Sequence, residues 1–370
     1  DVVHPDERLE VHGQAVRKMA NQAAHGTQGP AVSLPAMGLP APARVRACQN
    51  RQTFTLSSMD PVILFFLFGL AAGLLRSELK LPGALYDSLT IFLLLAIGLK
   101  GGQGLATQPL APLVPQILAV IVLGCVQTLL AYAVLRWLFG FDRPNAAATA
   151  AHYGSVSVAT FAVAAAWFAA RAIPVEPQMA VILAVMEVPA ILVGIVLARG
   201  VDKDTDWKAL GHEAFLGKGV TLLLGGMAIG WAAGPKGLEP ISALYFDLFK
   251  GILALFLLEM GLIVSRQVGE LRRRGLSLIA FGVGMPLLSA VLGLGTGWLL
   301  GLSVGGMAML ATLAASASYI AVPAAMRIAV PQANPAVSLA GALGVTFPFN
   351  LIAGIPLYQW MATRLAGATP

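Results

Sequence analysis

Two serine-bearing apolar stretches hold most of the side chains in this sequence that could bind a solute. The first, from Asn145, reads NAAATAAHYGSVSVATFAVAAAWF, and the second, from Val304, reads VGGMAMLATLAASASYIAVPAAMRIAVP. A proline-containing apolar stretch follows each of them, starting at Ala184 and at Gly344. Interrupted hydrophobic segments at corresponding positions of two halves are typical of the binding site of a secondary transporter.

Unwinding near the centre of these stretches would expose backbone groups beside hydroxyl groups. Helix N-termini attract anions through their dipole and their free N–H groups, whereas freed carbonyls and hydroxyls can surround Na⁺. The polar or helix-breaking residues concerned are Thr149, His152, Gly154, Ser155, Ser157 and Thr160 in the first stretch and Thr312, Ser316, Ser318 and Pro323 in the second. Small and hydroxylated residues also permit close helix packing, so a structural role is the alternative for each.

Glu187 is a carboxylate in the middle of an apolar segment, VILAVMEVPAIL. Intramembrane carboxylates are costly and usually functional, so we expect Glu187 to help bind Na⁺ or to carry a proton. Its counterpart in the second half is Thr346, and the expected ion-coupling group is therefore Glu187, Thr346, Ser157 and Ser318. The alternative for Glu187 is a structural hydrogen bond to a neighbouring helix. Glu259 is a second candidate for a buried functional carboxylate.

Composition identifies the class of protein that must position these residues. Hydrophobic residues make up 57% of the chain and charged residues only 11%, against about 25% charged in soluble domains. The net charge of +6 resides in loops that flank apolar segments, so we expect no nucleic-acid partner. The two cysteines lie far apart and predict neither a disulfide nor a metal site, and we expect no cofactor.

Apolar runs predict an all-α integral membrane protein with ten transmembrane helices, of which the fourth and ninth are broken. The expected segments are 61–75, 84–99, 111–138, 145–170, 177–198, 219–234, 244–264, 275–300, 303–330 and 336–363. A spanning helix needs about 20 apolar residues. We interpret residues 1–58, which are polar and rich in Pro and Gly, as a disordered leader or as sequence upstream of a true start at Met59.

The two halves predict an inverted repeat. Residues 59–198 form the first five-helix repeat, 199–218 the central loop, and 219–370 the second repeat. Basic residues concentrate in the loops after helices 1, 3, 5, 7 and 9, while the opposite loops hold few, such as Lys100 and Lys236. Positive charge marks the cytoplasmic side, so we expect a multi-pass protein of the cell (inner) membrane with a cytoplasmic central loop and both termini outside. An odd number of helices per half inverts the second repeat relative to the first.

Several stretches resemble the SbtA-type sodium-dependent bicarbonate transporter family, in order along the chain. They are IGLKGGQGLA from Ile97, GSVSVATFAVA from Gly154, MEVPAILVGIV from Met186, GILALFLLEMGLIVSRQVGELR from Gly251, and the longest, AASASYIAVPAAM and its continuation from Ala314. The resemblance implies Na⁺-coupled uptake of bicarbonate by alternating access and a homotrimer in the lipid bilayer. The solute-binding residues that it implies are Gly154, Ser155, Ser157, Thr160, Ser316 and Ser318, with support from Glu187.

Two features depart from the pattern of that family. Tyr319 stands where those relatives have an aspartate after the serines of helix 9, so this ring would shape the anion pocket. The central loop is also shorter than in those relatives, which does not favour the PII-like regulator that binds them. Another small monocarboxylate, proton coupling through Glu187 and a passive anion channel are the alternatives. The sequence contains no HExxH or GxSG-type element that would favour an enzyme.

Overall fold

The computed structural model describes residues 60–109, 111–200, 211–212 and 216–367, apart from the side chains of residues 273 and 274. The chain divides into two units, Asp1–Phe54 and Thr55–Pro370, and all the described residues belong to the second. The predicted leader over residues 1–58 and most of the predicted central loop lie outside the described residues.

Every regular element among the described residues is a helix. In chain order the α-helices are α2 (Pro61–Leu74), α3 (Gly83–Leu105), α4 (Leu113–Ala133), α5 (Arg143–Gly154), α6 (Val158–Ala170), α7 (Met179–Arg199), α9 (Lys218–Leu238), α10 (Phe249–Arg274), α11 (Leu276–Leu299), α12 (Val304–Ala314), α13 (Ala321–Ala329), α14 (Pro335–Gly341), α15 (Phe347–Phe349) and α16 (Ile355–Leu365). Short 3-10 or π turns extend or join them: η2 (Val134–Leu138), η3 (Glu239–Ile241), η4 (Ala243–Asp247), η5 (Ala342–Thr346) and η6 (Asn350–Gly354).

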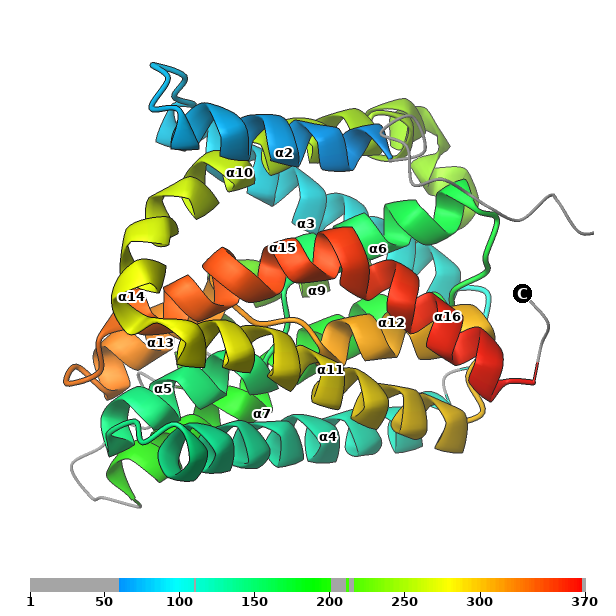
Figure 1. The fold of residues 1–370 in the computed structure, drawn as a ribbon. Coiled ribbons are helices and arrows are strands. Elements are labelled where there is room, and N and C mark those ends of the chain that lie inside the picture. Colours follow the sequence, from blue (N-terminus) through cyan, green and yellow to red (C-terminus); the bar gives the residue numbers. More distant parts are fainter. Residues whose placement is uncertain (1–59, 110, 201–210, 213–215, 368–370) are drawn as a thin grey trace, which may run out of the picture. The chain divides into compact units, whose positions relative to one another are not determined.

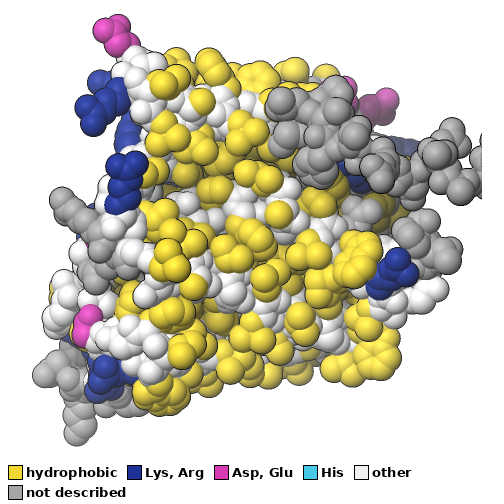
Figure 2. Space-filling model, in the orientation of Figure 1, with side chains coloured by type: hydrophobic (Ala, Val, Ile, Leu, Met, Phe, Trp, Pro, Cys, Tyr) yellow, Lys and Arg dark blue, Asp and Glu magenta, His cyan; other side chains and the backbone are white. Residues whose placement is uncertain are grey.

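Seven described helical stretches are long and apolar enough to cross a membrane, so the chain is a multi-pass membrane protein. One of them joins α5 to α6, and another runs from α14 to α16. The other three predicted segments are also helical, but α2 and α12 are shorter, and glycines and lysines dilute the apolar residues of α9. Figure 2 shows apolar side chains over most of one face, with Lys and Arg at its two edges.

Two predicted segments have different boundaries in the structure. The second segment was expected to end at residue 99, but α3 continues to Leu105 and therefore contains Lys100. The seventh was expected over 244–264, whereas α10 begins at Phe249 and continues to Arg274. Lys and Arg are good helix formers, so a charged residue at the end of an apolar run need not end the helix.

The fourth and ninth segments are each interrupted. Between α5 and α6, Ser155 and Ser157 have extended backbones, and the Ser157 side chain caps α6. Between α12 and α13 the helix stops at Ala314 and resumes at Ala321. Pro323 lies in the first turn of α13, where its missing N–H costs no helical hydrogen bond. We call residues 155–157 the first break and residues 315–320 the second break.

Helices α2 and α10 lie side by side and run in the same direction (Figure 1). Gly69 packs directly on the backbone of Leu258, and Gly73 packs on Ser265 one to two turns further along both helices. A Cβ atom at Gly69 would collide with that backbone, so glycine permits the close approach.

Helices α3 and α9 form a second parallel pair. Gly98 contacts the backbone of Leu223, and Gly102 contacts that of Met227, again in increasing order along both helices. The remaining long helices surround the breaks, since α5 packs against α4 and α7 while α12 packs against α11 and α16.

Candidate functional site

The two breaks meet inside the protein and are hydrogen-bonded to each other. The backbone N–H of Ser157 donates to Ser316 Oγ at 2.9 Å. The N–H of Ser318 donates to the carbonyl oxygen of His152 at 2.8 Å. The side chains of Ser157, Ser316 and Ser318 are all at most 3% exposed. The tertiary structure therefore joins the two serine clusters that the sequence places about 160 residues apart.

His152 supplies a second contact between the breaks. Its Nδ1 lies 2.6 Å from the carbonyl oxygen of Ser318, and because a carbonyl only accepts, Nδ1 carries the hydrogen. The ring is 2% exposed. His152 is thus a packed, hydrogen-bonded histidine that holds the second break.

The first break is ordered by its own side chains. Ser157 Oγ accepts from the backbone N–H of Thr160 at 3.2 Å and from Thr160 Oγ1 at 3.0 Å. Ser155 Oγ donates to the carbonyl oxygen of Glu187 at 3.5 Å. Gly154 ends α5 against Thr128 of α4, where a Cβ atom would collide with the threonine hydroxyl. These contacts place the start of α6 at the centre of the site.

Two amide side chains hold the carbonyls that are freed where α12 ends. Gln127 Nε2 donates to the oxygen of Ala314 at 2.9 Å, and Asn350 Nδ2 donates to that of Ala315 at 2.8 Å. The hydroxyl of Tyr358 donates to Asn350 Oδ1 at 2.8 Å. Sequence reasoning missed Gln127 and Asn350, although a carboxamide inside an apolar segment was the signal that could have identified both.

Tyr319 lies in the second break and is 9% exposed. Its ring packs edge-on against Phe347, with 5.7 Å between the ring centroids. Its hydroxyl lies beside Ser157 but has no hydrogen-bond partner within the described residues. A buried hydroxyl without a partner is costly unless a ligand or water satisfies it. The Tyr319 hydroxyl is therefore available to a bound solute.

The backbone carbonyl of Glu187, in the middle of α7, contacts the first break at Ser155. The Glu187 side chain is 5% exposed, and its carboxylate faces Gly219 in the first turn of α9. Oxygen Oε2 has no hydrogen-bond partner among the described residues. The N-terminus of α9 carries partial positive charge, which favours a carboxylate here.

Thr346 and Glu259 make no hydrogen bond to either break in the described part of the chain. The Thr346 hydroxyl donates to the oxygen of Gly282 at 2.7 Å and accepts from Tyr153 at 2.8 Å. Glu259 lies on α10, is 6% exposed, and has an unpartnered Oε2 atom among the described residues. The structure therefore places Glu187 next to the breaks and gives Thr346 other partners. The solute-binding candidates that lie at the breaks are Gly154, Ser155, Ser157, Thr160, Ser316, Ser318 and Tyr319.

Four helix ends converge at the breaks. The N-termini of α6 and α13 bring free N–H groups, and the C-termini of α5 and α12 bring freed carbonyls. Within the described ranges there is no group of three His, Cys, Asp or Glu residues that could hold a metal ion. Hydroxyl and carbonyl oxygens are present, and they are the ligands by which broken helices hold Na⁺. The arrangement can accommodate a small anion and a monovalent cation together.

A family model described as the Na⁺-dependent bicarbonate transporter superfamily matches residues 61–363. The match includes both breaks, Glu187, and the helices that pack around them. No curated protein gives a significant match.

Proposed function

The chain belongs to the Na⁺-dependent bicarbonate transporter superfamily, and on that premise we propose that it takes up bicarbonate together with Na⁺ as a secondary active transporter. The observation that carries the proposal is the hydrogen-bonded meeting of two helix breaks in the protein interior. Broken helices provide opposite partial charges at one depth, which suits an anion and a coupling cation.

The anion binds at the N-termini of α6 and α13. The first amides of these helices have no partner inside their own helix, and their dipoles favour negative charge. Ser155, Ser157, Thr160, Ser316 and Ser318 supply hydroxyls around this position. The unpartnered hydroxyl of Tyr319 supports a further hydrogen bond to the anion, in place of a carboxylate that would repel it.

Na⁺ binds to oxygens of the same breaks. Hydroxyls of Ser157 and Ser318 and carbonyls at the ends of α5 and α12 are the proposed ligands. Glu187 couples the ion to the conformational change, since its free Oε2 atom can respond to a nearby cation. Thr346 contributes to coupling indirectly, through Tyr153, which adjoins the first break.

The same free carboxylate oxygen favours one alternative, proton coupling. A buried, unpartnered carboxyl is more easily kept neutral than charged, so Glu187 can carry a proton instead of responding to Na⁺. In that case the transported anion is bicarbonate or another small monocarboxylate.

The proposed membrane plan is ten helices in two inverted five-helix repeats. Under this plan α2 corresponds to α9 and α3 to α10, so the pair α2–α10 must mirror the pair α9–α3. The parallel, glycine-mediated packing of both pairs supports this correspondence. We place the central loop in the cytoplasm and both termini outside, on the distribution of basic residues. A homotrimer is expected from the family resemblance.

The decisive experiment is uptake of carbon-14-labelled bicarbonate by the full chain in liposomes, with and without an inward Na⁺ gradient. We expect uptake that requires Na⁺ and that is lost in Ser155→Ala and Ser318→Ala proteins that remain folded. Uptake driven by a pH gradient and insensitive to Na⁺ would establish the proton-coupled alternative. A folded protein that moves neither bicarbonate nor a small carboxylate under any gradient would refute the proposal.

A further inference from the structure

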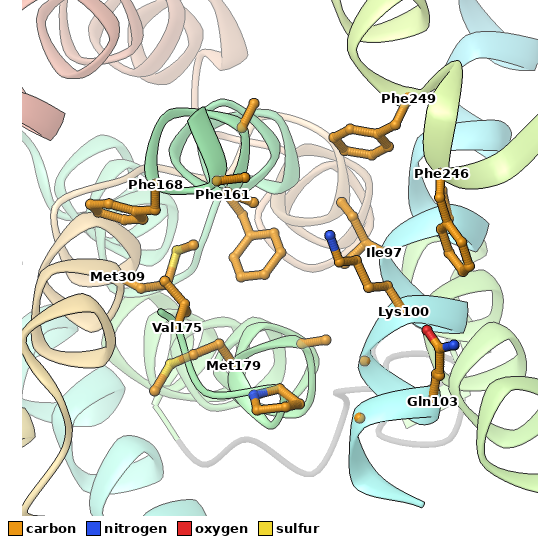
Figure 3. Close-up of a pocket in the computed structure, with 18 of the residues that line it drawn as sticks. Ile97, Lys100, Gln103, Phe161, Phe168, Val175, Met179, Phe246, Phe249 and Met309 are labelled. Atoms are coloured by element: carbon orange, nitrogen blue, oxygen red, sulfur yellow. The ribbon is translucent and has the colours of Figure 1, made fainter. Parts of the chain in front are cut away.

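A cavity of about 680 Å³ opens beside the first break (Figure 3). Helix α3, η4 and the start of α10 form one wall, and α6, α7 and α12 form the other. Phe161, which lines the cavity, directly follows Thr160 of α6, whose hydroxyl donates to Ser157 of the first break. The cavity thus runs along α6, the helix that starts at the first break, and extends to the ends of α3 and α6, where Gly104 and Ala170 line it.

Lys100 places a positive charge in this otherwise mainly apolar cavity. Figure 3 shows the side chain of Lys100 extending from α3 with its amino group directed into the space across from Phe161. Lys100 is positioned there because α3 continues past the end that the sequence predicted. Its amino group forms no ion pair with any described residue.

The other charged residues that line the cavity are engaged elsewhere. Lys250 forms an ion pair with Asp60, with 3.2 Å between Nζ and Oδ2. Glu176 accepts hydrogen bonds from the backbone N–H of Ser303 at 2.6 Å and from its hydroxyl at 3.1 Å, at the start of α12. Among the cationic side chains of the lining, Lys100 is therefore the one without an ion pair in the described structure, while the carboxylate of Glu176 is held at the N-terminus of α12, whose partial positive charge offsets part of its own.

A cation without an ion pair on the wall of a mainly apolar cavity attracts small anions. Low-dielectric walls focus the field of the charge, which raises the local concentration of an oppositely charged solute and its rate of association. The cavity is large enough for a small hydrated anion, and its second cation, Lys250, is already paired with Asp60.

We propose that Lys100 is the anion-attracting residue of the access path, selecting small monovalent oxyanions such as bicarbonate or a short carboxylate before they reach the helix breaks. This inference rests on the proposed transport function and adds a selectivity step to it. Lys100 acts on the approach of the solute rather than in the bound complex, so it changes KM more than kcat.

The first test measures uptake kinetics of Lys100→Gln and Lys100→Arg proteins in liposomes. We expect Lys100→Gln to raise KM about three- to tenfold with little change in kcat, and Lys100→Arg to retain the wild-type KM. The difference in KM between Lys100→Gln and wild type should shrink at high ionic strength, because salt screens a charge at a solvated wall. Lys236→Gln is the matched control, since this exposed lysine ends α9 at the same side but does not line the cavity.

The second test reads the electrostatic potential of the cavity without relying on transport. Gln103→Cys, made with Cys48→Ser and Cys125→Ser, places a thiol on the cavity wall one turn from Lys100. The measured quantity is the ratio of the rates at which an anionic and a cationic methanethiosulfonate modify this thiol. This ratio should be higher when Lys100 is present than in a Lys100→Gln background. We expect a severalfold change in that ratio.

The two tests separate the failure of this inference from that of the transport proposal. Unchanged KM and an unchanged reagent ratio in Lys100→Gln would overturn the role of Lys100 even if the wild-type protein moves bicarbonate. A wild-type protein without bicarbonate uptake would count against the transport proposal, and the reagent ratio would still decide whether Lys100 attracts anions.

Discussion

His152 and Ser318, which are 166 positions apart, exchange two hydrogen bonds across the centre of the protein. The ring Nδ1–H of His152 donates to the carbonyl oxygen of Ser318 at 2.6 Å, and the N–H of Ser318 donates to the carbonyl oxygen of His152 at 2.8 Å. The carbonyl of His152 is in the last turn of α5, where carbonyls have no partner within the helix, and the carbonyl of Ser318 is in the second break. The pair therefore satisfies exposed backbone groups and fixes the two breaks as one unit.

Removing the ring donor should destabilise the protein. His152→Leu leaves the buried carbonyl of Ser318 without its partner, so we expect the free energy of unfolding to fall by about 1–3 kcal/mol. Thermal unfolding of the purified protein in detergent measures the change. His152→Asn can place an amide N–H near the position of Nδ1 and should recover most of the loss. Equal stability of His152→Leu and wild type would contradict a joining role for this ring.

Ser157→Ala should lower uptake by more than its loss of stability explains. The change removes the cap of α6 and a proposed ligand of both anion and Na⁺, and we expect uptake to fall at least tenfold. Ser303→Ala is the comparison, because Ser303 caps α12 through the N–H of Gly306 at 3.0 Å at the opposite end of that helix from the second break, where its hydroxyl also contacts Glu176. Each variant should lose about 1 kcal/mol of stability. Comparable uptake by the two would exclude a binding role for Ser157.

Gln127→Leu should impair transport although no sequence motif marks this residue. The carbonyl of Ala314 would lose its donor, and the second break would shift or become mobile. Gln116→Leu provides the comparison, since Gln116 is also a buried glutamine of α4 and its Oε1 atom is unpartnered within the described residues. We expect a tenfold loss of uptake in the first variant and less than twofold in the second. The reverse order would show that Gln127 does not position the site.

Glu187→Gln should change the ion dependence of uptake while leaving the fold intact. Because Oε2 has no partner among the described groups, the amide replacement breaks no visible hydrogen bond there. We expect the half-saturating Na⁺ concentration to rise at least tenfold, as measured by uptake over a range of Na⁺ gradients. Glu259→Gln, which alters the other buried carboxyl with a free oxygen, should leave this value within twofold of wild type. A normal Na⁺ response in Glu187→Gln would remove Glu187 from the coupling mechanism.

Tyr319→Phe should separate binding from stability. The hydroxyl makes no hydrogen bond within the described structure, so its loss should leave the unfolding temperature unchanged or slightly raised. We expect weaker anion affinity, with KM rising about tenfold as one hydrogen bond to a charged group disappears. Tyr358→Phe is the comparison. The Tyr358 hydroxyl donates a hydrogen bond to Asn350, so its removal should lower the unfolding temperature. Unchanged KM in Tyr319→Phe would mean that the solute does not reach this hydroxyl.

Much of the local structure could be predicted from the amino-acid sequence. Apolar runs and their length predicted helices over every segment that the described residues contain, and the small, hydroxyl-bearing stretches predicted where two helices would be interrupted. Helix ends were less certain, because Lys100 and Arg266 can lie within a helix as readily as in a loop. The expected inverted orientation of the halves remains a prediction.

The sequence by itself determined the membrane-embedded helical class, the family, and the two serine-bearing breaks, since hydrophobicity and local backbone preferences act over short spans of chain. Only the tertiary structure decided which polar atoms meet. Gln127 and Asn350 donate hydrogen bonds to freed carbonyls, and Lys100 faces a cavity. One oxygen each of Tyr319 and Glu187 has no hydrogen-bond partner among the described residues. The reason is physical: satisfaction of a buried polar group depends on helices far apart in the chain, and local preference cannot encode their packing.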